Sequence, residues 1–104
     1  MILSTTPTLE GRPIREYLGI VTAESIYGTN VVRDIMAGWK NLVGGRSQAY
    51  ESVLQETRDK AYSELEARAA ALGADAVVGI GAEISSFGDG SMFVLILTGT
   101  AVKL

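Results

Sequence analysis

The chain has 104 residues, of which 47% are hydrophobic and 20% are charged, and its net charge is −3. This length fits one domain, residues 1–104, with a core of its own. The nine basic residues are scattered along an acidic chain, so the charge pattern excludes a nucleic-acid-binding surface.

Cysteine and histidine are both absent from the sequence. Their absence excludes disulfides, thiol chemistry, the usual zinc and iron–sulfur sites, and catalytic triads built on either residue. The first residues lack the basic start and apolar run of a signal peptide, and no segment approaches the ~20 apolar residues that cross a bilayer. We therefore expect a cytoplasmic protein that is not an enzyme and binds neither membranes nor nucleic acid.

The N-terminal third predicts two strands with a polar link between them. Residues 2–6 indicate a short strand or arm, and Pro7 and Pro13 bracket a link that is typical of a turn. Residues 14–26 are rich in β-branched and aromatic side chains, which predicts the first main strand. Residues 27–30 have the composition of a turn.

Two amphipathic helices are predicted next, because apolar residues recur at steps of three and four over 31–43 and again over 48–72. The glycines at 44–45 predict a sharp corner between them. The long helix has Ser47 as its expected N-cap, and Gly73 can adopt the left-handed conformation that ends a helix. At about 1.5 Å per residue it is longer than a small sheet needs, so we expect part of it to extend towards a neighbouring subunit.

The C-terminal third predicts a β-hairpin, with strands at 76–85 and 92–102 and a turn at 89–90. Both faces of the last strand are apolar, but the long helix can cover only one face of so small a sheet. The second face is therefore expected to meet another subunit. The predicted fold class is α+β, a two-layer β-α-α-β-β subunit whose small antiparallel or mixed sheet is covered on one face by the long helix.

The motifs Gly-Gly-Arg-Ser-x-x-Tyr-Glu at 44–51 and Gly-Ala-Asp-Ala-Val-Val-Gly at 73–79 are specific when they occur together. With further matches at 4–11, 19–26 and 98–102, the sequence resembles the YbjQ family of small bacterial proteins over nearly its whole length. The resemblance implies one YbjQ-like domain with a dodecin-like subunit that assembles into a closed homopentamer. It also implies a heavy-metal-binding label without an established activity.

This chain has few side chains that could bind a heavy metal. Soft metals prefer thiolate and imidazole, and here only carboxylates and the thioethers of Met36 and Met92 remain. Where family members often carry an acidic–aromatic pair after the Val-Val-Gly strand, this chain has Ser85 and Ser86, so Glu83 is the lone acid there. The metal and any cofactor stay unassigned.

Candidate ligand-binding residues come from the family motifs. Glu24 and Asp34 could supply carboxylates for a hard cation or for acid–base chemistry, although ion pairs with arginines are the commoner role for such groups. Arg46 beside free helix amides could hold an anion, although helix-corner geometry alone explains it. Glu51 complements the helix dipole. The ligand-binding candidates are Glu24, Arg33, Asp34, Arg46, Ser47, Tyr50 and Glu51.

The sequence therefore favours a homo-oligomeric binding or scaffold protein, a pentamer by resemblance, with a small ligand or metal ion at its subunit seams. The alternative is an enzyme, such as a hydrolase with Glu24 and Asp34 as acid and base, which needs two carboxylates together in a cleft. Trp39 could stack on a flat cofactor such as a flavin, but its place on an apolar helical stripe favours packing. A membrane-surface helix at 31–43 would have only Arg33 and Lys40 as cations.

Overall fold

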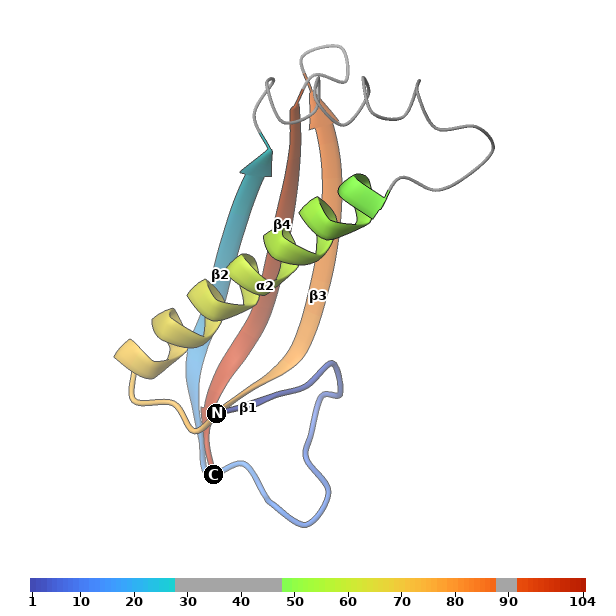
Figure 1. The fold of residues 1–104 in the computed structure, drawn as a ribbon. Helices are drawn as coiled ribbons and strands as arrows, with labels where there is room; N and C mark the ends of the chain where they lie inside the picture. The colour runs from blue at the N-terminus through green and yellow to red at the C-terminus, as the bar shows by residue number, and fades with distance from the viewer. Residues whose placement is uncertain (28–47, 88–91) are drawn as a thin grey trace.

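The computed structural model describes residues 1–27, 48–87 and 92–104, which form one four-stranded sheet and one long helix (Figure 1). The strands are β1 (Ile2–Leu3), β2 (Glu16–Tyr27), β3 (Ala76–Phe87) and β4 (Met92–Lys103), and the helix is α2 (Gln48–Ala71). The predicted helix at 31–43, the corner at 44–45 and the turn at 89–90 lie outside the described residues. None of the described helical residues forms a stretch that could span a membrane.

The sheet is mixed and has the strand order β1-β3-β4-β2. β4 pairs antiparallel with both β2 and β3, and β1 pairs parallel with β3 through only two residues, Ile2 and Leu3. Among the described strands, β2 therefore forms one edge of the sheet, and most of β3 forms the other. The predicted α+β class is confirmed, and assembly into a dodecin-like closed oligomer stays a prediction.

An N-terminal arm is fixed to the base of β3 at a break in the strand. The register of β3 against β4 shifts between Val78 and Gly81. Gly79 lies in this break with a φ of 62°, a conformation that side chains other than glycine rarely adopt. Its amide donates to the Thr6 carbonyl at 2.8 Å, and the Ile80 amide donates to Ser4 at 3.1 Å.

The C-terminus of α2 is a Schellman motif centred on Gly73. Gly73 has a φ of 80°, its amide donates to the Ala70 carbonyl at 2.9 Å, and the Ala74 amide donates to the Ala69 carbonyl at 3.1 Å. The prediction that Gly73 ends the helix is confirmed. Ser47, the predicted N-cap, lies outside the described residues.

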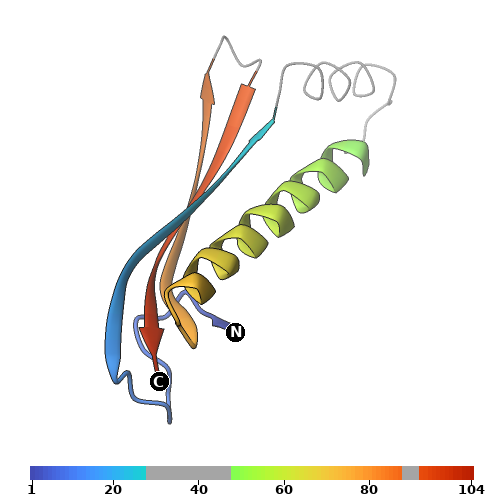
Figure 2. The ribbon, with the colours of Figure 1, turned by 90° about the vertical axis from the view of Figure 1, so that its left-hand side faces the viewer.

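α2 lies over one face of the sheet, as Figure 2 shows from the side, and the core lies between the two. The helix contributes buried side chains at four-residue steps, which confirms the predicted apolar stripe. Leu72, the last residue of that stripe, lies past the end of α2 and is exposed. The buried residues of α2 are Thr57, Ala61, Leu65 and Ala69, and those of β2 and β4 include Val21, Ala23, Leu95, Leu97 and Ala101.

The opposite face of the sheet is covered only at its base by described residues. There Leu9 and Ile14 of the N-terminal link pack on Val78 and Val102. Further along the strands no described element lies on this face. The expectation that the helix covers one face only is therefore confirmed for the described part of the chain.

Candidate functional site

The candidate site is the uncovered part of the sheet, which we call the open face. Along β2 the side chains of Val21, Ala23 and Ser25 are buried against α2, so the alternate residues point the other way. The strand register places residues of β4 and β3 beside them. The open face consists of Ile20, Thr22, Glu24 and Ile26 of β2, Val94, Ile96 and Thr98 of β4, and Gly81, Glu83 and Ser85 of β3.

Two carboxylates lie in one row across the open face. Glu24 of β2 and Glu83 of β3 are both the direct neighbours of Ile96 in β4. Because paired residues in antiparallel strands are about 5 Å apart at Cα, the two glutamates are separated by about 10 Å. Both side chains are exposed, so their carboxylates can turn towards one another over Ile96 and reach the same small cation.

A shallow depression of about 400 Å³ lies beside Glu83. Gly81 deepens it because the residue has no side chain, and a Cβ added there would meet only Thr98 Oγ1, at 3.7 Å. The wall thus offers a carboxylate, a hydroxyl and aliphatic groups to a small ligand. The lining residues are Gly81, Ala82, Glu83, Ile96 and Thr98.

One chain supplies an incomplete cation site. The described residues contain no group of three or more Asp, Glu, His or Cys side chains that could hold a metal ion. Calcium takes six to eight oxygen ligands, and magnesium takes six. The Glu24–Glu83 row could therefore hold such an ion only with additional ligands from water or from a second chain.

The sequence-predicted site is described only in part. Glu24 lies on the open face and is exposed. Tyr50 and Glu51 lie in the first turns of α2, but their side chains are outside the description. Arg33, Asp34, Arg46 and Ser47 lie outside the described residues, so the predicted cluster stays a prediction.

The row formed by Glu24, Ile96 and Glu83 is the feature that sequence reasoning missed, because Glu83 is a lone acid along its own strand. Part of this row can be predicted from the hairpin, because its turn places Glu83 opposite Ile96. The position of Glu24 in the row depends on the register of β2 on β4. These two strands are far apart in the sequence, and no local pattern fixes their alignment.

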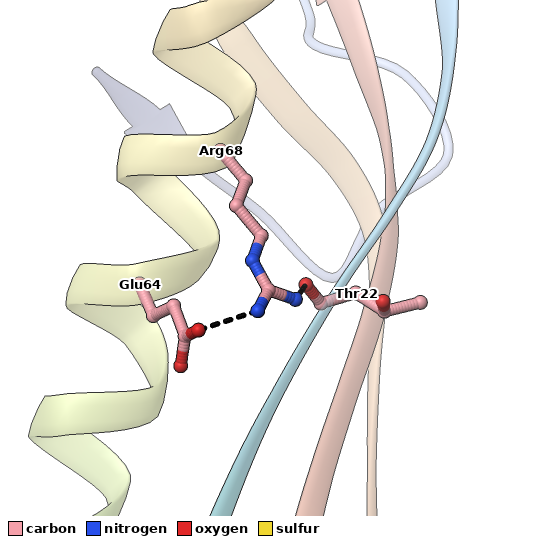
Figure 3. A network of polar contacts seen from close by, with 3 residues as sticks. All are labelled: Thr22, Glu64 and Arg68. Carbon is pink, nitrogen blue, oxygen red and sulfur yellow. Dashed lines mark hydrogen bonds and ion pairs between the residues drawn. The ribbon is translucent and has the colours of Figure 1, made fainter.

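A polar cluster fixes α2 to β2 at the sheet edge (Figure 3). Arg68 Nη1 donates to the Thr22 carbonyl oxygen at 2.5 Å, and Arg68 Nη2 lies 2.5 Å from Glu64 Oε1, one helical turn away. This ion pair orients the guanidinium group towards β2. Glu24 and Glu83 lie on the opposite face of the sheet, away from α2.

Three comparisons relate the chain to known proteins. The family model YbjQ, described as "Putative heavy-metal-binding", matches residues 1–104. A UPF0145 protein of Pseudomonas entomophila (strain L48) is 56% identical over 105 residues, which cover 100% of this chain and 99% of the relative.

The fold is similar to a crystal structure from Pediococcus pentosaceus ATCC 25745, which is described as a protein of unknown function in the DUF74 family. The TM-score is 0.70, and the match covers 100% of this chain and 97% of that one at 19% sequence identity. At this identity the likeness shows the shared fold.

Proposed function

Since the chain belongs to the YbjQ family, we propose that it is a homo-oligomeric scaffold that binds a metal ion or another small cation at its open face. One observation carries this proposal. Glu24 and Glu83 flank Ile96 in a single row on a sheet face that no described element covers. The family description names heavy-metal binding, and this row brings two carboxylates to one exposed face of the sheet.

Apolar exposure supports the oligomeric part of the proposal. Ile20 is 79% exposed and Ile26 is 56% exposed, and both lie on the open face, Ile20 opposite Thr100 and Ile26 opposite Val94. Fully burying one isoleucine side chain is worth about 2 kcal/mol. Association through this face would bury both isoleucines, and a second chain would supply the ligands that the Glu24–Glu83 row lacks. A pentamer is the state that the family resemblance implies.

The chemistry of the donors selects the ligand class. Carboxylate oxygens favour hard cations such as Mg²⁺, Ca²⁺ and Mn²⁺, whereas soft metals favour thiolate and imidazole. The sequence contains no cysteine or histidine. We therefore expect Mn²⁺ or Ca²⁺ to bind in preference to Cu⁺ or Cd²⁺.

Native mass spectrometry of the protein as purified from cells, followed by calorimetric titration with Mn²⁺ and Ca²⁺, tests both parts. We expect a discrete oligomer, and we expect Glu24→Gln/Glu83→Gln to reduce cation affinity at least tenfold. Glu56→Gln, which removes an exposed carboxylate from α2, is the matched control and should bind like the wild type. A monomer at all concentrations would refute the scaffold, and an unchanged affinity in the double variant would refute the site.

An enzyme that uses Glu24 and Asp34 is the alternative. Asp34 lies outside the described residues, so the distance between the two carboxylates stays untested. Glu24 itself lies on an exposed strand face, whereas an acid–base pair needs enclosure with apolar neighbours. No observation on the described residues favours this alternative over binding.

A further inference from the structure

β2 is an edge strand of 12 residues, and its outer side has no partner strand among the described residues. A long edge strand presents unpaired N–H and C=O groups, which form a template for strands of other molecules. Proteins block such edges with charged side chains, bulges or covering elements. The edge of β2 therefore requires either a feature that prevents strand pairing or a strand that pairs with it.

The alternation of the backbone shows which residues of β2 face this edge. The Val77 carbonyl accepts from the Ser4 amide, directly after β1, so the N–H and C=O of the next residue, Val78, point towards Thr100 of β4. Thr100 therefore directs its N–H and C=O towards β3. Because this direction repeats every second residue, Thr98 of β4 does the same. Thr22 is paired with Thr98, so it directs its N–H and C=O away from β4 and towards the free edge.

Arg68 occupies this edge at Thr22. Its guanidinium donates to the outward-facing Thr22 carbonyl from the helix side (Figure 3). Glu64, one turn earlier on α2, holds the second guanidinium nitrogen. The guanidinium thus stands where an incoming strand would place its own amide donor.

We propose that the outer edge of β2 is a strand-pairing surface for β2 of a second copy, and that Arg68 keeps this surface closed. An antiparallel pairing centred on Ala23 places Ile20 opposite Ile26 of the second copy and Thr22 opposite Glu24 of the second copy. The two exposed isoleucines then form a cross-strand apolar pair. In the register shifted by one pair, the two copies of Glu24 oppose each other directly, which is destabilising.

Arg68 blocks the centre of this ladder. In the centred register the Thr22 carbonyl accepts a hydrogen bond from the Glu24 amide of the second copy, and the two-fold symmetry repeats this bond. In each chain that carbonyl already accepts from Arg68. A carbonyl oxygen can accept two hydrogen bonds, but the guanidinium stands at the edge where the second strand would lie. Pairing therefore requires both arginines to leave. This surface lies at the edge of the open face and shares the side chains of Ile20 and Ile26 with it, so the oligomeric state of the wild type is the reference in the experiment.

Sedimentation and light scattering over a hundredfold concentration range test the proposal with Arg68→Ala and Arg68→Met. Arg68→Met keeps the aliphatic stem and should preserve the fold. We expect both variants to double the mass of the wild-type particle, and the amides of Thr22 and Glu24 to exchange more slowly in the doubled particle. Arg58→Ala is the matched control because Arg58 is also an exposed arginine of α2, whereas the hydrogen bond to Thr22 comes from Arg68.

Cross-linking tests the register, since the sequence has no cysteine of its own. Residues paired across the ladder are about 5.5 Å apart at Cα, which suits a disulfide. We expect Ile20→Cys and Ile26→Cys chains to cross-link when they are mixed in the Arg68→Ala background, and not when Arg68 is kept. An unchanged mass in both Arg68 variants would overturn the proposal, as would cross-linking that is independent of Arg68.

Discussion

Gly99 lies in β4 opposite Val21, on the face that packs against α2. A Cβ placed at this position would lie 2.6 Å from Val77 Cγ1 and 3.1 Å from Ile80 Cγ1. Real Cβ atoms do not tolerate the shorter distance, so these side chains would have to shift. The core of the hairpin is thus packed so closely at Gly99 that it leaves no room for even a methyl side chain.

We expect Gly99→Ala to destabilise the protein by about 1–3 kcal/mol, the usual cost of adding a methyl group to a packed core. Urea unfolding followed by circular dichroism measures this change. Gly81→Ala is the matched control, because the added Cβ meets only Thr98 Oγ1 at 3.7 Å. If the two variants lost equal stability, the tight packing at Gly99 would not be the cause.

At the scale of elements, the sequence predicts features that depend on consecutive residues better than it predicts the pairing of distant strands. The four-residue stripe of α2 and the glycine at its end are properties of consecutive residues, and both were predicted from the sequence. The parallel pairing of β1 with β3 was not, because it joins segments that are far apart in the sequence. The Glu24–Glu83 row was missed for the same physical reason, since it depends on the register of β2.

The end of α2 provides a second prediction. Gly73 has a φ of 80°, where a Cβ costs about 1–2 kcal/mol. The added atom would meet only the end of the flexible Lys103 side chain, at 3.6 Å, so strain of the backbone is the dominant cost. We expect Gly73→Ala to lower the free energy of unfolding by about 1 kcal/mol or more in a urea titration.

Gly73→Asn separates the backbone effect from other causes. Asparagine adopts the left-handed conformation more readily than alanine. It should therefore recover part of the lost stability, although its side chain is larger. A variant with asparagine that is less stable than the variant with alanine would show that space, and not backbone conformation, limits this position.

For the whole molecule, the main feature is the unequal cover of the two sheet faces. One face packs against α2, and the other exposes Ile20 and Ile26 in the described part of the chain. If the open face is buried between copies, assembly adds to the free energy of unfolding of each subunit. The midpoint of thermal unfolding should then rise with protein concentration.

We expect Ile20→Thr/Ile26→Thr to shift the oligomer towards smaller species, because threonine keeps the strand propensity but removes apolar surface. Size-exclusion chromatography with light scattering measures the shift. Ile84→Thr is the matched control, since Ile84 is also exposed, at 60%, but is paired with Leu95 on the α2 side of β3. An equal shift in both variants would place the subunit contact elsewhere.

The strand order also bears on how the chain folds. β3 and β4 are close in the sequence and can pair early, whereas β2 pairs with β4 across most of the chain, from Glu16 opposite Lys103 to Tyr27 opposite Phe93. Closing so long a loop is slow. We therefore expect β2 to dock late in refolding. Until it docks, β4 is itself an open edge, and the yield of refolded protein should fall as the refolding concentration rises.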